Sequence, residues 1–163
     1  MTSLPRSFLV SIAFFSLSLL ASGAHADAAG DLATEKKLST DYLALMAKEQ
    51  NAQVIDSGVV IRPIFTSSSD VKPKLEDTVM VAYHLADREG KLIEESLTSD
   101  ELAVFPLGKL IKCWQIAITQ MPVGSLFKIT CPSDVAYGDK GAGTEIKPGA
   151  ALTFRVTLYG IQK

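Results

Sequence analysis

The stretch FPLGKLIKCWQIAITQMPVG, residues 105–124, holds the only tryptophan of the chain and indicates the element around which the rest folds. A turn precedes the apolar pair Leu110 and Ile111, and Trp114 follows three residues after Ile111. Positions three or four apart share one face of a helix. We therefore expect a short helix on which these three side chains form an apolar floor, although burial in an ordinary core is the commoner use of a tryptophan.

Strand patterns flank this stretch on both sides. Residues 78–85 and 151–159 alternate between apolar and polar side chains, as a strand with one buried face does. Residues 59–65 and 125–131 are two further strands, and the turn at residues 87–90 returns the chain as a hairpin. About five antiparallel strands and one short helix predict an α+β fold in which the sheet wraps around the helix.

A glycine-rich loop at residues 132–150 separates the last two expected strands. A phosphate-binding loop would need a helix after it that begins with Lys and Ser or Thr, and here a strand follows. We instead expect a loop that brings the hydroxyl of Tyr137 over a pocket.

A helix is expected before the sheet, over residues 31 to about 52. Leu38, Tyr42, Leu45 and Met46 form one apolar stripe on it. A single helix cannot bury such a stripe alone. The sequence leaves two partners open for it, the following domain or a second copy of the chain in a homodimer.

The first residues, 1–26, have the pattern of a signal peptide. Arg6 precedes the uncharged run at residues 8–20, and A-H-A at residues 24–26 is a cleavage signature. The run is shorter than the roughly 20 residues of a membrane-spanning helix, which argues against the alternative of an uncleaved anchor. We expect a mature chain that begins at Asp27, is periplasmic or secreted, and has no stable membrane insertion.

Charge and histidine content exclude several classes of function. The formal net charge is −2 and no basic block occurs, which argues against nucleic-acid binding. His84 is the only histidine beyond residue 26 and is expected on a solvated strand face, so no catalytic triad, metal site or cofactor is predicted. Glu94 and Glu95 are neighbours on a strand and point to opposite faces, so they do not share a site.

Two cysteines, Cys113 and Cys131, are present in the whole chain. An even count in an exported protein favours a disulfide, which would join the tryptophan helix to the start of the glycine-rich loop. No C-x-x-C motif occurs, which argues against redox catalysis.

A set of residues between position 75 and the C-terminus carries a family resemblance. Its members are Val79, Val81, Tyr83, Glu89, Gly90, Leu107, Gly108, Trp114, Met121, Gly124, Ala136, Tyr137, Gly138, Ile146, Pro148, Leu152 and Phe154. In order and spacing they resemble the FKBP-type peptidyl-prolyl cis-trans isomerases, and the bacterial macrophage infectivity potentiator type among them. The resemblance implies an FKBP-like fold, with a helical extension at residues 27–57 and an isomerase domain at residues 58–163.

The resemblance also implies a pocket for a proline ring. Its residues would be Tyr83, Glu94, Phe105, Leu110, Ile111, Trp114, Tyr137, Ile146 and Phe154. Trp114 would lie under the ring, and the Tyr137 hydroxyl and the Ile146 backbone N–H would hold substrate carbonyls. Glu94 would accept a hydrogen bond from Tyr83.

Three positions depart from the family pattern. Ile93 replaces a usual Phe, Glu94 a usual Asp, and Ala103 an aromatic residue of many members. These changes imply a shallower pocket and put the turnover rate and the affinity for macrolide inhibitors in question.

The function implied by these residues is isomerisation of X–Pro bonds in exported, proline-containing polypeptides. Amide resonance sets a barrier of roughly 18–20 kcal/mol, and an apolar pocket disfavours the planar, charge-separated amide relative to the twisted one. No covalent step is needed. The alternative is a catalytically weak proline-binding module or folding chaperone on the same fold.

Overall fold

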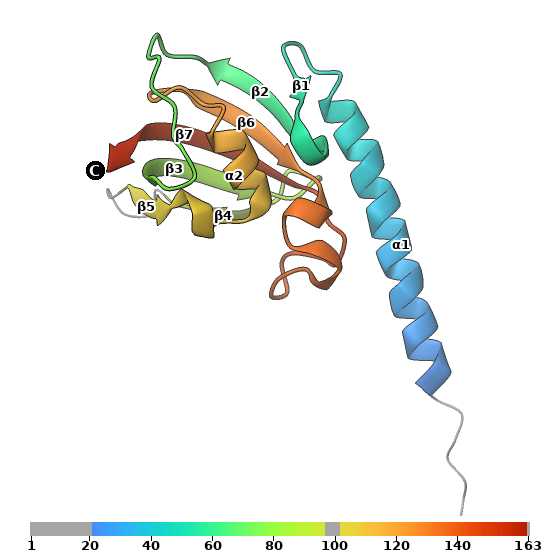
Figure 1. Ribbon diagram of the computed structural model, residues 1–163. Helices are drawn as coiled ribbons and strands as arrows, with labels where there is room; N and C mark the ends of the chain where they lie inside the picture. The colour runs from blue at the N-terminus through green and yellow to red at the C-terminus, as the bar shows by residue number, and fades with distance from the viewer. Residues whose placement is uncertain (1–20, 97–101, 163) are drawn as a thin grey trace, which may run out of the picture.

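In the part of the chain that the structure describes, residues 21–96 and 102–162, one antiparallel sheet lies between two helices (Figure 1). This structure is a computed structural model. The helices are α1 (Ala21–Met46) and α2 (Lys112–Ile118), and the strands are β1 (Gln53–Val54), β2 (Val60–Phe65), β3 (Thr78–Ala86), β4 (Leu92–Glu95), β5 (Ala103–Pro106), β6 (Leu126–Cys131) and β7 (Leu152–Gln162). Of the expected signal peptide, residues 1–20 lie outside the described residues, and its cleavage stays a prediction.

The seven described strands pair in the order β1-β2-β6-β7-β3-β4, and β5 also pairs with β3. Every pair is antiparallel, as expected. The expected count of about five strands was too low. β1 has two residues, a length too short to show the alternation that indicates a strand.

The inner face of the sheet is apolar and carries α2. The alternating sides of β3 and β7 are buried as predicted, at Val79, Val81, Tyr83, Leu85, Leu152, Phe154, Val156 and Leu158. α2 packs its own buried side chains into this concave face (Figure 1). The helix begins at Lys112, so Leu110 and Ile111 precede it and do not share a helical face with Trp114.

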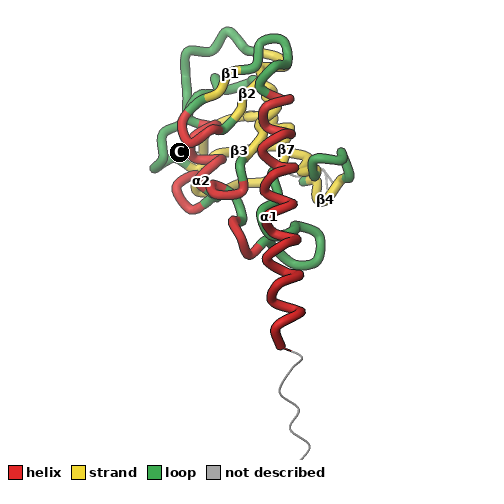
Figure 2. The backbone as a smooth tube through the Cα atoms, turned by 90° about the vertical axis from the view of Figure 1, so that its right-hand side faces the viewer, coloured by secondary structure: helices red, strands yellow, loops and turns green. Residues whose placement is uncertain are grey.

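The longer helix, α1, lies against the opposite side of the sheet, and its first turns project beyond the body of the domain (Figures 1 and 2). It ends at Met46, earlier than the expected residue 52, because turns at residues 47–51 reverse the chain into β1. Asn51 adopts a left-handed φ of 64° in this reversal. None of the described helices combines the length and apolar character needed to cross a membrane.

The face that α1 turns to the domain differs from the expected apolar stripe. Glu35 and Ser39 are 7% and 4% exposed, whereas Leu38 and Leu45 are 41% and 60% exposed. Met46 alone of the leucine and methionine positions in the stripe is buried. The helix therefore does lie on the domain, but mainly through polar residues, and pairing of the exposed leucines with a second copy stays a prediction.

Candidate functional site

A pocket of about 110 Å³ opens on the α2 side of the sheet. Its lining consists of Tyr83, Leu85, Glu94, Phe105, Leu110, Ile111, Trp114, Tyr137 and Phe154. These residues come from four strands, the start of α2 and the glycine-rich loop. Sequence reasoning omitted Leu85, although its place two residues after Tyr83 on the same strand face was a usable signal. Of the expected site residues, Ile146 is absent from the lining.

Four aromatic rings surround the base of the pocket. The Trp114 ring centroid lies 5.1 Å from that of Tyr83, 5.4 Å from that of Phe154 and 6.4 Å from that of Phe105, each at 74° or more between planes. Edge-to-face pairs of this kind are favourable. The Trp114 indole N–H is buried and has no hydrogen-bond partner among the described residues. Packing rather than hydrogen bonding thus holds the tryptophan in place.

A polar rim adjoins these rings. The Tyr83 hydroxyl donates a hydrogen bond of 2.5 Å to Glu94 Oε1, which is the contact that the family resemblance implied. Glu94 itself is exposed because it lies on β4, the last strand of the sheet order. Glu95 points to the other side, where a carboxylate oxygen lies 3.3 Å from His84 Nδ1. The two carboxylates therefore do not share a site, and His84 is exposed as expected.

The two phenols of the pocket hold their protons strongly. Burial raises the pKa of Tyr83 above its usual value, and the hydrogen bond to Glu94 adds to the rise. Burial also raises the pKa of Tyr137, with a smaller contribution from the negative charge of Glu94. Within the described residues, no hydrogen bond joins the Tyr137 hydroxyl to another side chain. It is therefore a protonated donor that a ligand can use.

The backbone of Ile146 is occupied by another contact. Its N–H donates to the Ala142 carbonyl at 3.0 Å, and the Ala142 N–H donates to the Ile146 carbonyl at 2.9 Å. The expectation that this N–H holds a substrate carbonyl therefore does not fit this arrangement. Ile111 lies in the pocket lining as the N-cap residue of α2, and its N–H has no backbone acceptor in the described part of the chain.

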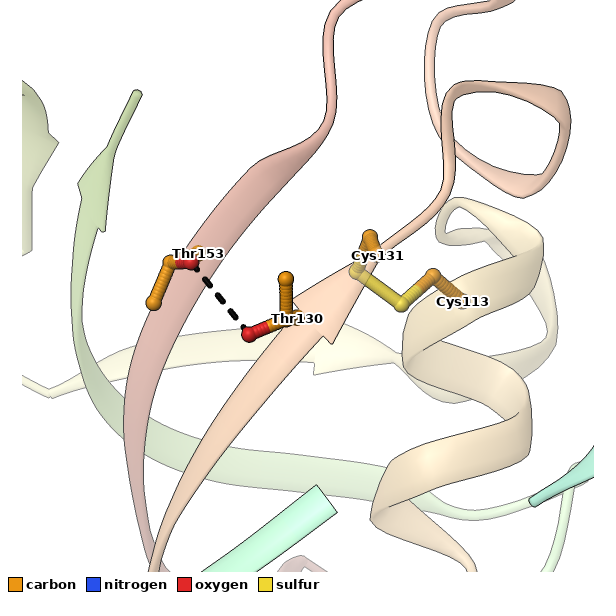
Figure 3. Close-up of a disulfide and its surroundings, with 4 residues drawn as sticks. All are labelled: Cys113, Thr130, Cys131 and Thr153. Carbon is orange, nitrogen blue, oxygen red and sulfur yellow. Dashed lines mark hydrogen bonds between the residues drawn. A yellow bond between two sulfur atoms is a disulfide. The ribbon is translucent and has the colours of Figure 1, made fainter. Parts of the chain in front are cut away.

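A disulfide joins Cys113 to Cys131 beside the pocket (Figure 3). Both residues are fully buried, and their Cα atoms lie 5.8 Å apart. The bond connects the first turn of α2, next to Trp114, to the last residue of β6, where the glycine-rich loop begins. Thr130 points to the opposite side of β6 and hydrogen-bonds Thr153 at 3.3 Å (Figure 3).

The remaining departures from the family pattern lie outside the pocket lining. Ile93 and Ala103 are half-buried and pack against the main hydrophobic core. The effect of these two residues on pocket depth stays a prediction. Among the described residues, no group of three or more His, Cys, Asp or Glu side chains is placed to hold a metal ion.

Known sequences match most of the chain. A family model described as FKBP-type peptidyl-prolyl cis-trans isomerase matches residues 69–159. The FKBP-type peptidyl-prolyl cis-trans isomerase FkpA of Aeromonas hydrophila is 36% identical over 82% of this chain and 49% of its own length. The peptidyl-prolyl cis-trans isomerase Mip of Coxiella burnetii is 38% identical over 77% of this chain and 54% of its own. The chain thus spans about half the length of the curated relatives that it matches.

Solved structures share the same arrangement. A peptidyl-prolyl cis-trans isomerase of Pseudomonas syringae superposes with a TM-score of 0.75 at 26% identity, covering 80% of this chain and 96% of that one. FkpA of Escherichia coli superposes with a TM-score of 0.80 at 28% identity, covering 86% of this chain and 65% of that one. The second likeness extends over most of the described residues.

Proposed function

Because the chain belongs to the family of FKBP-type peptidyl-prolyl cis-trans isomerases, we propose that it accelerates rotation about X–Pro bonds in polypeptides. The observation that carries the proposal is the aromatic pocket, in which three rings meet Trp114 edge-on beneath a small apolar space. Such a space suits an apolar ring rather than a charged group. The Tyr137 hydroxyl at the same pocket supplies a donor for a peptide carbonyl.

The proposed mechanism uses no covalent step. Rotation about the X–Pro amide is slow because resonance keeps the bond planar and charge-separated. A pocket of aromatic and aliphatic groups solvates that charge separation poorly, and so favours the twisted amide relative to the planar one. Tyr137 would hold a substrate carbonyl, and the Ile111 N–H is a better candidate than the Ile146 N–H for a second contact because it is not taken by a backbone carbonyl.

Glu94 has a supporting part in this proposal. By accepting the hydrogen bond of the Tyr83 hydroxyl, it fixes the phenol of one pocket wall. The ring of Tyr83 in turn packs edge-to-face against Trp114. Glu94 thus acts on the shape of the pocket and not as a proton-transfer group.

The setting that we propose is an exported one, with residues 1–26 as a cleaved signal peptide. The uncharged run and the A-H-A sequence support it, as does a buried disulfide made from the two cysteines of the chain. One relative is named outer membrane protein MIP, from Legionella longbeachae, and is 29% identical over 80% of this chain. The substrates would then be proline-containing segments of exported proteins.

The test is cis/trans exchange of a short Leu-Pro-Phe peptide, measured by NMR. Tyr137→Phe removes one unpaired hydroxyl and should lower kcat/KM by about tenfold, since a hydrogen bond to a reacting group is worth about 1–1.5 kcal/mol. Trp114→Ala should abolish acceleration. Tyr159→Phe is the matched control, because Tyr159 is an exposed phenol on β7 whose side chain lies away from the pocket.

Two other results would change the conclusion. Peptide binding that is lost in Trp114→Ala, without acceleration by the unaltered protein, would favour the alternative of a proline-binding module or folding chaperone. If the unaltered protein neither accelerated cis/trans exchange nor bound the peptide, the proposal would be overturned.

A further inference from the structure

The buried face of α1 is polar, and each of its polar groups has a partner on the domain. Glu35 and Ser39, at 7% and 4% exposure, are two of the few polar residues that are buried in the described chain. Buried polar groups are normally hydrogen-bonded. Glu35 pairs with Arg88 in the turn between β3 and β4, and Ser39 contacts the end of the glycine-rich loop. The helix therefore contacts the turn between β3 and β4, two strands that contribute to the pocket, and the loop that carries Tyr137.

Ser39 makes two hydrogen bonds to the chain just after the glycine-rich loop turns toward β7. Its hydroxyl donates to the Gly149 carbonyl at 2.9 Å and accepts from the Ala151 N–H at 2.8 Å. Gly149 has a φ of +79°, and a Cβ there would lie 2.9 Å from side-chain atoms of both Leu32 and Lys36. The loop end thus fits closely on α1, and only glycine fits without strain.

Gly149 also makes a hydrogen bond toward the pocket side of the loop. Its N–H donates to the Gly138 carbonyl at 2.9 Å, and Gly138 directly follows Tyr137. Two consecutive hydrogen bonds through Gly149 therefore link Ser39 to Gly138, the residue that follows Tyr137 in the chain. Tyr137 is the pocket group that the glycine-rich loop contributes.

A second contact reaches the same region from the neighbouring turn of α1. The Lys36 ammonium lies 2.6 Å from a carboxylate oxygen of Asp139, which is two residues beyond Tyr137. Both side chains are largely exposed, so this ion pair alone contributes little. Together with the contact at Gly149, it means that α1 contacts the glycine-rich loop at two places, Asp139 and Gly149.

We propose that Ser39 is a positioning residue for Tyr137, so that a helix outside the isomerase domain helps to set the geometry of the pocket. The inference rests on the proposed function, because it concerns the hydroxyl that would hold a substrate carbonyl. Ser39 touches no pocket group itself and acts through Gly149 and Gly138. Without its hydroxyl, the Gly149 carbonyl and the Ala151 N–H lose their partner, and the loop carrying Tyr137 is held less firmly.

The test compares Ser39→Ala with Thr40→Ala in the full chain. Thr40 is the adjacent residue and is exposed, and among residues 21–96 and 102–162 its hydroxyl bonds only the Lys36 carbonyl of its own helix. A third variant, Tyr42→Phe, removes the 2.8 Å bond between α1 and Thr153 on β7, and so weakens the docking of the helix away from the loop. The readouts are kcat/KM on the proline peptide, the amide exchange of Gly149, and the NMR signals of the Tyr137 ring.

We expect Ser39→Ala to lower kcat/KM by about threefold to tenfold. This is the equivalent of losing the one hydrogen bond that Tyr137 would make to the substrate. The Gly149 amide should exchange faster and the Tyr137 ring signals should shift, whereas Thr40→Ala and Tyr42→Phe should change neither. If Ser39→Ala matched Thr40→Ala in all three readouts, the inference would be wrong. It would also be wrong if Tyr42→Phe reproduced the whole effect, because helix docking in general would then be responsible.

The failure of the proposed function would be recognised separately. If the unaltered protein did not accelerate cis/trans exchange of the peptide, the hydrogen exchange of the Gly149 amide and the Tyr137 ring signals would still decide whether Ser39 positions the loop. If Ser39→Ala did not fold, Ser39→Cys would replace it, because a thiol is a weak donor and a weak acceptor, with the same ring signals as readout. An unchanged Tyr137 ring in that variant would overturn the inference.

Discussion

Reduction of the disulfide between Cys113 and Cys131 should destabilise the protein by an amount that follows from its position. The two residues are 18 positions apart. Closing a loop of this length removes about 10.7 cal/mol/K of entropy from the unfolded chain, which stabilises the fold by about 3.2 kcal/mol at 25 °C. With urea m-values of roughly 1–3 kcal/mol/M, the midpoint of unfolding should fall by roughly 1–3 M.

The assay is equilibrium unfolding in urea, followed by the fluorescence of Trp114 with and without reductant. Because Trp114 adjoins Cys113 in α2, its emission reports directly on the helix that the bond holds. The double variant Cys113→Ala with Cys131→Ala is the control and should not respond to reductant. Equal midpoints for the unaltered protein in both conditions, or titration of two free thiols without reductant, would refute the reasoning.

Three further predictions concern charges and hydrogen bonds near the pocket and under α1. In a double-mutant cycle, Tyr83→Phe and Glu94→Ala should be coupled by on the order of 1 kcal/mol in urea unfolding, since each removes the same hydrogen bond, and additive effects would contradict the contact. The raised folded-state pKa values of Tyr83 and Tyr137 should keep activity level up to about pH 10. The stability that these two groups contribute should be complete below the unfolded pKa near 10 and should be lost as pH rises through the folded values. Urea unfolding at about pH 9 and 11 measures this, and a higher free energy of unfolding at pH 11 would contradict it. Arg88→Met should cost about 3–5 kcal/mol by leaving the buried Glu35 carboxylate unpaired, and adding Glu35→Gln should recover part of that loss, as thermal unfolding of both variants would measure.

The parts of the fold that the sequence predicted are those with a regular, one-sided pattern. β3 and β7 alternate because one face of each is buried under α2, and that alternation is visible without any structure. β1 has two residues and shows no period. For α1, the apolar stripe coincides only in part with the face that packs on the domain, because that packing depends on Gly149, Ala151 and Thr153, more than a hundred positions away in the chain. Thr153, a polar residue of the alternating pattern in β7, is buried beneath the helix.

The candidate site divides in a similar way. Trp114 was expected from its place after the apolar pair, whereas Phe105 and Phe154 were implied by the resemblance to the FKBP-type isomerases. The three side chains lie together in the pocket lining. The Ile146 N–H is harder to assess, because a backbone donor has no signature in the sequence. Whether it is free depends on the turn that pairs it with Ala142, and that turn is visible only in the structure.

The glycine-rich loop at residues 132–150 is held at its two ends by contacts that do not belong to the pocket. Cys131, just before it, is bonded to α2, and Gly149, at its end, is bonded to Ser39 of α1. Restraining the ends of a loop lowers the entropy that is lost when its middle is ordered by a ligand. Tyr137, in that middle, keeps its hydroxyl available while its backbone neighbour Gly138 is tied to Gly149. On this reasoning, the disulfide and α1 act on substrate binding in the same manner, by ordering the loop before the substrate arrives.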